Sequence, residues 1–153
     1  TESSDCKLVK DGCCDWCGTP TLGDLDPVHR NRTQQHYNDV CSNPGKICPS
    51  CPRGAIPESF EAHCSGGVCR EIDLSSYQSC SSNSDCRIRT LDCCESCSSD
   101  TSREALVAIN RNDAGAVENA LCPSPKPACP NCPIQYPSNL NAVCNSNGRC
   151  TLK

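Results

Sequence analysis

Apolar and polar side chains alternate over a few short segments of this chain, and no long apolar run occurs. Residues 87–91 (Arg-Ile-Arg-Thr-Leu) alternate as the residues of a half-buried strand do, and residues 6–10 (Cys-Lys-Leu-Val-Lys) are their equivalent near the N-terminus. The Asp11-Gly12 step that follows is a turn signal. The pattern therefore predicts one short strand early in each half of the chain.

A second pattern predicts a hairpin late in each half. Residues 142–144 and 149–152 flank residues 145–148 (Asn-Ser-Asn-Gly), a polar stretch with a glycine suited to a turn. Cys64 and Cys69 flank residues 65–68 (Ser-Gly-Gly-Val) in the same way. These segments add two strands to each half.

Helix-like residues lie between the strand and the hairpin, at about residues 113–121 and at about residues 33–40. Residues 105–109 (Ala-Leu-Val-Ala-Ile) allow two interpretations. They could start a helix, because Thr101 and Glu104 have capping-box spacing, or they could form a further strand. Periodicity does not separate these two.

The cysteines repeat in register and divide the chain. Of the nineteen, eighteen form two runs displaced by 80 or 81 positions, and Cys80 has no counterpart, since its equivalent would lie one position ahead of Thr1. The first run is Cys6, Cys13, Cys14, Cys17, Cys41, Cys48, Cys51, Cys64 and Cys69; the second is Cys86, Cys93, Cys94, Cys97, Cys122, Cys129, Cys132, Cys144 and Cys150. We expect module 1 at residues 1–72, a linker at 73–79 and module 2 at 80–153.

This cysteine content is typical of a disulfide scaffold, because each half has too few apolar residues for a substantial core. We expect nine disulfides and one thiol, and different partners for adjacent Cys13 and Cys14 and for Cys93 and Cys94. The predicted fold is a small disulfide-rich α+β protein of two tandem homologous modules, each a short three-stranded antiparallel sheet with one helix. Disulfides persist in oxidising compartments, so a secreted, extracellular protein is expected, with any leader removed. It would be a monomer, or a dimer through the odd cysteine of module 1.

Several kinds of chemistry are disfavoured. The net charge is −4 and basic residues are dispersed, which argues against a nucleic-acid partner, and no segment resembles a membrane span. Two paired CxxC motifs could hold zinc, but they belong to a larger cysteine framework, so we expect disulfides and no metal. His29, His36 and His63 all lie in module 1 and are expected at the surface. We therefore expect no enzyme and no cofactor.

Two kinds of extracellular binding remain, beside a purely structural role in a matrix. Lys46-Ile47 and Lys126 lie in short cysteine-bounded, proline-containing loops, as in a double-module serine protease inhibitor, although Pro127 after Lys126 suits such a loop poorly. Trp16 and Tyr37 are candidate contacts for carbohydrate or cell wall in a lectin-like protein, where two modules would add avidity. Asn31 opens a glycosylation sequon.

A family resemblance rests on the order of these motifs in module 2. Ser84-Asp85-Cys86, a strand, Cys93-Cys94-x-x-Cys97, residues 108–111 (Ala-Ile-Asn-Arg), a Cys-Pro step and a closing hairpin follow one another. The run resembles cysteine-rich repeats of unknown function in secreted or lipid-anchored bacterial proteins, with eukaryotic relatives. More distantly, it is similar to tandem disulfide-knot lectins of protist walls. The resemblance implies a disulfide-rich fold and an extracellular location, and no particular site residue.

Overall fold

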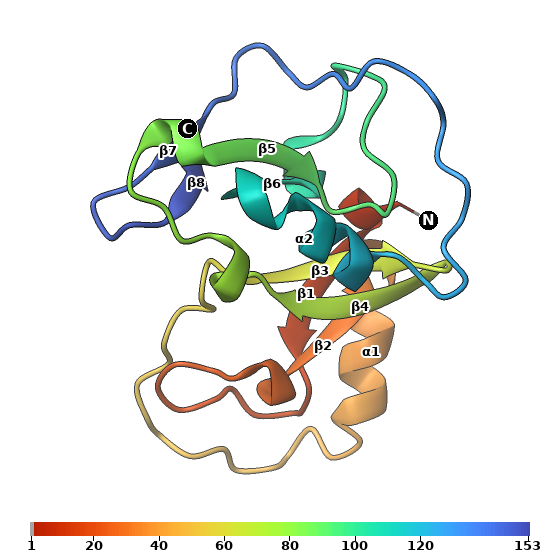
Figure 1. Ribbon diagram of the computed structural model, residues 1–153. Coiled ribbons are helices and arrows are strands. Elements are labelled where there is room, and N and C mark those ends of the chain that lie inside the picture. Colours follow the sequence, from red (N-terminus) through yellow and green to blue (C-terminus); the bar gives the residue numbers. More distant parts are fainter. Residues whose placement is uncertain (1) are drawn as a thin grey trace.

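The structure, a computed structural model, describes residues 2–153 and contains short strands and two short helices. In module 1 the elements are β1 (Cys6–Lys10), β2 (Leu25–His29), α1 (Thr33–Val40), β3 (Phe60–Ser65) and β4 (Val68–Asp73). In module 2 they are β5 (Cys86–Thr90), β6 (Leu106–Asn110), α2 (Ala114–Leu121), β7 (Ala142–Cys144) and β8 (Cys150–Leu152). Module 1 forms the lower half of Figure 1 and module 2 the upper half, with β3 and β4 between the two. The two helices and the first strand of each module (β1 and β5) lie within about one residue of the positions that the sequence predicts.

The three-stranded sheet predicted for each module is wrong. The strands form four separate two-stranded antiparallel sheets, β1–β2, β3–β4, β5–β6 and β7–β8. The first strand of each module contacts the late hairpin without joining its hydrogen-bond ladder, as β1 does with β3 and β5 with β7. Its ladder partner is instead the segment before the helix, β2 or β6. The mixed α and β content and the small size agree with the expectation.

Residues 105–109, for which helix and strand were both open, form most of a strand. β6 begins at Leu106, and its first four residues are all buried. A strand that is buried on both faces has no polar alternation, which is why periodicity could not identify it. Val107 and Ile109 are β-branched, which suits a strand.

Nine disulfides are present within residues 2–153, which is the expected number. Four bridges of module 1 have direct equivalents in module 2. They are Cys6–Cys69 and Cys86–Cys150, Cys13–Cys41 and Cys93–Cys122, Cys14–Cys48 and Cys94–Cys129, and Cys17–Cys51 and Cys97–Cys132. Adjacent cysteines pair with different partners, as predicted, because a bond between neighbours would strain the backbone. The ninth bridge joins Cys80 to Cys144, and the cysteine expected ahead of Thr1 lies outside the described residues.

The main apolar core belongs to module 2 and to the residues that enter it. Leu74, which lies in the segment expected to be a linker, is completely buried. It packs with Leu91, Val107, Ile109, Val117 and Leu121, and Ile72, Tyr77 and Ala114 lie against this cluster. The late hairpin of module 1 and the segment after it therefore contribute apolar surface to module 2. The module boundaries themselves stay a prediction.

Polar contacts also fasten the two halves together. The Ser3 amide donates to Asp92 Oδ1 at 2.8 Å, and the Ser3 hydroxyl accepts from the Cys64 amide at 2.9 Å. The side chain of buried Gln78 donates from Nε2 to the Ala108 carbonyl, and the backbone carbonyl of Gln78 accepts from the Cys150 amide. Such buried polar groups must be paired to avoid a desolvation cost, so these bonds make the relative position of the two halves specific. Within residues 2–153, no helix has the length and apolar character to cross a membrane.

Candidate functional site

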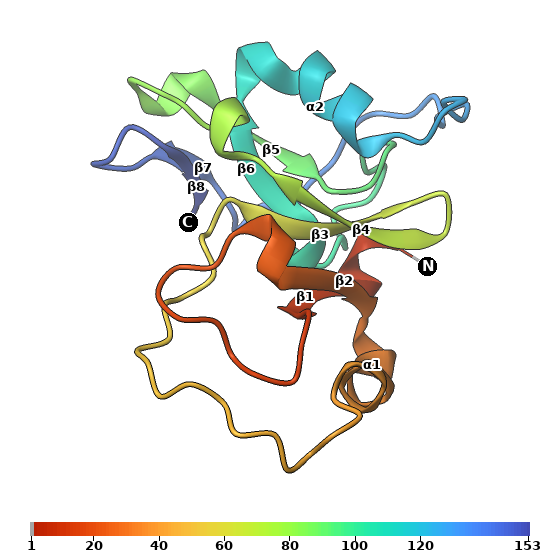
Figure 2. The same cartoon turned by 90° about the horizontal axis from the view of Figure 1, so that it is seen from below.

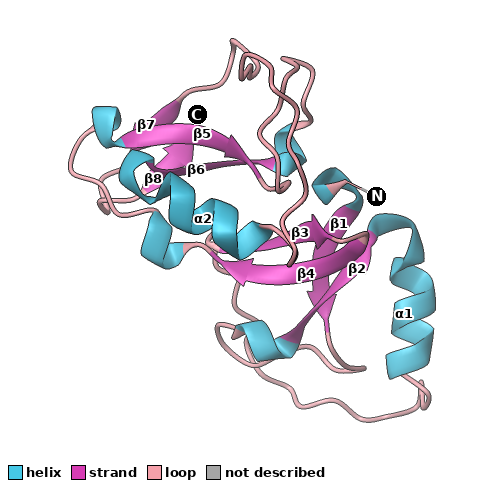
Figure 3. Cartoon of the chain, turned by 45° about the vertical axis from the view of Figure 1, so that its right-hand side comes forward, coloured by secondary structure: helices cyan, strands magenta, loops and turns pink. Residues whose placement is uncertain are grey.

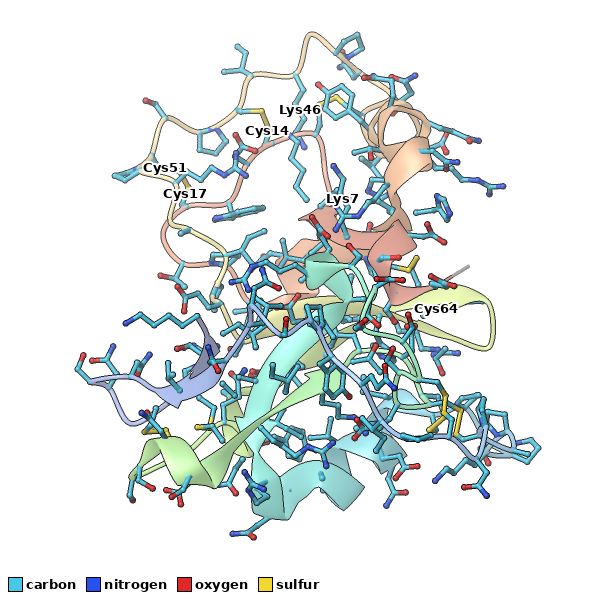
Figure 4. The ribbon with its side chains drawn as sticks, turned by 90° about the horizontal axis from the view of Figure 1, so that it is seen from above. Lys7, Cys14, Cys17, Lys46, Cys51 and Cys64 are labelled. Carbon is cyan, nitrogen blue, oxygen red and sulfur yellow. A yellow bond between two sulfur atoms is a disulfide. The ribbon has the colours of Figure 1, made fainter. Side chains whose placement is uncertain are left out.

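A long loop at the outer edge of module 1 is held by three disulfides, and we call residues 41–51 the Lys46 loop. Cys41, Cys48 and Cys51 are bonded to Cys13, Cys14 and Cys17, respectively. All three anchors therefore come from one five-residue segment of the chain. Figure 4 shows Lys46 with Cys14, Cys17 and Cys51 along one side of the molecule, and Figure 2 shows the loop at the end opposite α2. Cross-links at both ends and near the middle reduce the number of conformations that the loop can adopt.

The segment after the loop is held by Trp16. The indole Nε1–H donates to the Gly54 carbonyl at 2.9 Å, and the Arg53 guanidinium lies 4.4 Å from the ring centroid. The Gly54 amide donates to the Gly18 carbonyl at 2.7 Å. A Cβ at Gly54 would lie 2.4 Å from that carbonyl oxygen, so only glycine fits. These contacts of Trp16 and Gly54 fix the position of the chain just after Cys51.

Inside the loop, the backbone turns at Asn43 and then presents two exposed residues. The Lys46 amide donates to the Asn43 carbonyl at 3.0 Å, and the Gly45 amide donates to Asn43 Oδ1 at 3.2 Å. Ile47 is 93% exposed, the largest value among the exposed apolar residues described. Lys46 is exposed and takes part in no ion pair within residues 2–153. The arrangement displays a Lys-Ile peptide bond on a covalently restrained loop.

The corresponding loop of module 2 is tied back to its own helix. The Lys126 ammonium is hydrogen-bonded to Glu118 on α2, and this bond lowers the pKa of the Glu118 carboxyl group. Pro127 follows Lys126 directly. The two lysines that the sequence treats as equivalent are therefore presented differently.

The two aromatic candidates for carbohydrate binding differ in how far the structure exposes them. Trp16 is only 9% exposed and is covered by Arg53, so its ring packs within module 1. Tyr37 lies on α1, is 38% exposed and has the Lys10 ammonium 5.3 Å from its ring centroid. Asn31 is exposed in the short turn before α1, as a sequon residue should be.

The paired CxxC motifs are bridged to one another. Cys14 and Cys17 are bonded to Cys48 and Cys51, and the equivalent four sulfur atoms of module 2 are bonded in the same pattern. Among the described residues, two groups of three sulfur atoms lie within 4.8 Å of one another, and all of these atoms belong to disulfides. The groups are Cys80, Cys86 and Cys150, and Cys93, Cys94 and Cys129. Sulfur bonded in this way is not the thiolate that a zinc site uses.

A second site, which sequence analysis missed, lies where the two modules meet. This inter-module cleft has a volume of about 710 Å³. Three acidic and three basic side chains line it together with polar groups and strand residues. The lining residues are Arg30, Glu58, Glu61, Gln78, Arg103, Glu104, Leu106, Val107, Ala108, Asn145, Arg149, Cys150, Thr151 and Leu152. No signal in the sequence points to it, because the residues come from five separate segments.

Two titratable residues, Glu61 and His63, lie on β3, the strand between the two modules. Burial raises the pKa of Glu61 to about 7, against a smaller opposing effect of Arg149. His63 is 2% exposed and its Nδ1 lacks a hydrogen-bond partner within the described residues. Burial, and secondarily Arg70, lowers the pKa of His63, while Asp92 and Glu71 act in the other direction. The expectation that His63 would be a surface residue is wrong, since β3 is covered by module 2.

The covalent frame is the best-defined feature of the chain, and comparison with known proteins adds no relative to it. No protein-family model matches the sequence, and neither the curated proteins nor the solved structures include a significant match. The resemblance to cysteine-rich bacterial repeats thus stays a prediction, and the function has to be argued from the sites themselves.

Proposed function

We propose that the protein is a secreted, non-enzymatic inhibitor of a trypsin-like serine protease and that module 1 presents the Lys46–Ile47 peptide bond to the enzyme. The observation that carries the proposal is the restraint, by three disulfides, of a Lys-Ile step in which both residues are exposed and Ile47 is 93% exposed. A basic side chain suits the acidic specificity pocket of such proteases. A loop that is already ordered loses little conformational entropy on binding, which favours tight association.

The bridges would also keep a cleaved loop together. If the enzyme hydrolyses the Lys46–Ile47 bond, the new carboxylate end is still tied through Cys41 to Cys13, and the new amine end through Cys48 to Cys14. The two ends stay close to one another, so religation is an intramolecular reaction with a high effective concentration. This property distinguishes an inhibitor from an ordinary substrate.

Module 2 supports the proposal by contrast. Lys126 is bound to Glu118, and the peptide bond after it has proline on its leaving side. We therefore propose a single inhibitory loop rather than the two that the repeat suggests.

The test is a titration of trypsin activity on a chromogenic peptide with the intact protein and with two matched variants. We expect stoichiometric inhibition that Lys46→Ala abolishes, that Lys46→Arg retains and that Lys126→Ala leaves unchanged. Inhibition that survives in Lys46→Ala would overturn the proposal. Rapid turnover of the chain as a substrate, seen by intact mass as the gain of one water followed by loss of inhibition, would overturn it equally.

Carbohydrate binding is the alternative that this argument displaces. The position of Trp16 under Arg53 leaves Tyr37 as the more exposed of the two aromatic candidates. Retention on cellulose or chitin that is lost in Tyr37→Ala, together with no effect on trypsin, would establish the lectin-like function instead.

A further inference from the structure

The inter-module cleft holds charges that do not pair with one another. Arg103, Arg149 and Glu61 take part in no ion pair within the described residues, although all three line the same hollow. Arg149 donates from Nε to Gln78 Oε1 at 2.8 Å, which orients its guanidinium group. No hydrogen bond to the Glu61 carboxylate occurs within residues 2–153. Opposite charges that line one cleft without forming ion pairs match a ligand that itself carries both signs of charge.

Strand edges that line the cleft could supply backbone hydrogen bonds to the same ligand. Among the strands, β6 pairs only with β5 and β8 only with β7. Residues 78–80 already lie along the start of the outer edge of β8, where Ser79 and Arg149 form an antiparallel bridge and the Cys80 amide donates to the Gly148 carbonyl. The open part of this edge therefore lies at Leu152. Residues of both β6 and β8 line the cleft. A sheet edge of this kind can accept an extended peptide as an additional strand.

The register shows which backbone groups point to the outer edge of β8. Asn141 and Lys153 exchange two backbone hydrogen bonds, so Thr151, two residues earlier, also faces β7. Cys150 and Leu152 therefore direct their amide and carbonyl groups to the opposite edge. The Cys150 amide confirms this direction, because it donates to the Gln78 carbonyl at 2.7 Å.

The same alternation applies to β6. The Leu91 amide donates to the Ala105 carbonyl, which places Val107 in the ladder with β5 and turns Leu106 and Ala108 outward. The Ala108 carbonyl accepts from Gln78 Nε2 at 2.9 Å on this outward side. Gln78 therefore makes hydrogen bonds to the outer edge of β6, at Ala108, and to the outer edge of β8, at Cys150. Leu106 and Leu152 also line the cleft.

We propose that the inter-module cleft binds a short extended peptide that carries both an ammonium and a carboxylate group, with its backbone added to the outer edge of β8 at Leu152, beyond the part that residues 78–80 cover. Glu61 takes the ammonium group, and Arg103 and Arg149 take the carboxylate. The cleft volume of about 710 Å³ lies within the range of about 300–1,000 Å³ that is usual for small-ligand sites. The proposal uses no residue of the Lys46 loop, so protease inhibition and peptide binding can fail independently.

The test is an amide chemical-shift titration of the ¹⁵N-labelled protein with the blocked peptide acetyl-Lys-Val-Thr-Glu-amide in mildly alkaline buffer, where Glu61 is ionised. We expect saturable shifts at Leu152, Cys150 and Ala108. The neutral peptide acetyl-Gln-Val-Thr-Gln-amide should bind about tenfold or more weakly, because charge-assisted hydrogen bonds are lost. A peptide methylated at its valine and threonine nitrogens should lose most of its affinity, since it cannot donate to a strand edge.

Variants separate the two parts of the proposal. Arg103→Gln and Glu61→Gln should each weaken binding of the charged peptide several-fold while leaving binding of the neutral peptide nearly unchanged; Lys126→Ala serves as the remote control. Dispersed spectra of each variant would show that it is folded. Absence of saturable shifts, shifts confined to residues outside the cleft, or equal affinity for the charged and neutral peptides would overturn the proposal. Undiminished binding of the methylated peptide would overturn strand addition.

Discussion

Modules 1 and 2 share four equivalent disulfides around very different interiors. In module 2, α2 buries Val117 and Leu121 in an apolar core, whereas α1 of module 1 has no buried residue. Figure 3 shows the consequence, with α2 against the strands and α1 at the periphery. The bridges thus fix the course of the chain in both modules, while apolar packing contributes mainly in one.

The acidic residue that follows the two adjacent cysteines also differs between the modules in how deeply its partners are buried. Glu95 of module 2 accepts from Arg87 at 2.5 Å and from buried Arg89 at 2.9 Å, and it is also hydrogen-bonded to Tyr136. Its counterpart Asp15 contacts Arg53 at 3.6 Å at the surface, next to Trp16. Module 2 therefore ties the segment after its long loop to buried Arg89 through Tyr136 and Glu95, whereas Asp15 of module 1 makes only surface contacts among the described residues.

Removal of one matched bridge from each module should give the largest effect and the sharpest test of this comparison. Cys14→Ser/Cys48→Ser and Cys94→Ser/Cys129→Ser open loops of nearly equal length, so each should lower the free energy of unfolding by about 3–4 kcal/mol. Native-state hydrogen exchange should show loss of protection across module 1 in the first variant. In the second variant the core around Leu121 should stay protected. Equal loss of protection in both modules would contradict the difference that we describe.

The apolar core should be the next most sensitive feature. Leu121→Ala removes a completely buried side chain and should cost about 2–5 kcal/mol in the free energy of unfolding, measured with urea. Val40→Ala at the end of α1 is the matched control and should cost less than about 1 kcal/mol, because no residue of α1 is buried. Similar losses in the two variants would mean that module 1 has a core of comparable importance.

The charge of Glu61 should make stability depend on pH. The pKa of this group is raised from 4.5 to about 7 on folding, so the stabilisation from its protonated form is complete below pH 4.5 and is lost as the pH rises to about 7. The wild type should lose at most about 3 kcal/mol over this range relative to Glu61→Gln. His63, whose pKa is lowered, acts in the opposite direction in both proteins and cancels in the comparison. The measurement is urea unfolding of both proteins at a series of pH values; parallel curves would refute the assignment.

The ion pair between Lys126 and Glu118 should have the smallest effect. Both side chains are partly exposed, so Lys126→Ala should change the free energy of unfolding by no more than about 1 kcal/mol. The same variant should raise the pKa of Glu118 toward its ordinary value, which carboxyl-detected NMR titration can follow. An unchanged pKa would mean that the lysine does not hold this loop against α2.

Much of the local structure was predictable from the sequence. The helix at residues 33–40 and the late hairpin at Cys64 and Cys69 follow from short patterns of polar, apolar and glycine residues. Different partners for Cys13 and Cys14 follow from the geometry of the disulfide bond itself. These features depend on neighbours in the chain, which is why the sequence carries them.

Other features depend on contacts between distant segments, and the candidate sites belong to this group. Leu74 lies in a polar stretch and gave no sign of burial, yet it is part of the core because module 2 covers it. Trp16 was a candidate contact for carbohydrate, and its contact with Arg53 is a product of the fold. The inter-module cleft has no trace in the sequence for the same reason.

The sequence by itself determined that the chain has a disulfide scaffold, that its cysteines repeat and where several short elements lie, because composition and local periodicity are properties of the chain itself. It left the pairing of the cysteines open, since the bridges join residues that are 28 to 64 positions apart. Only the tertiary structure decided that the described strands form four separate pairs, that Lys126 bonds to Glu118 while Lys46 takes part in no ion pair within residues 2–153, and that charged side chains from both modules surround one cleft. These outcomes are set by which surfaces bury one another. Burial is a property of the assembled chain and not of any segment within it.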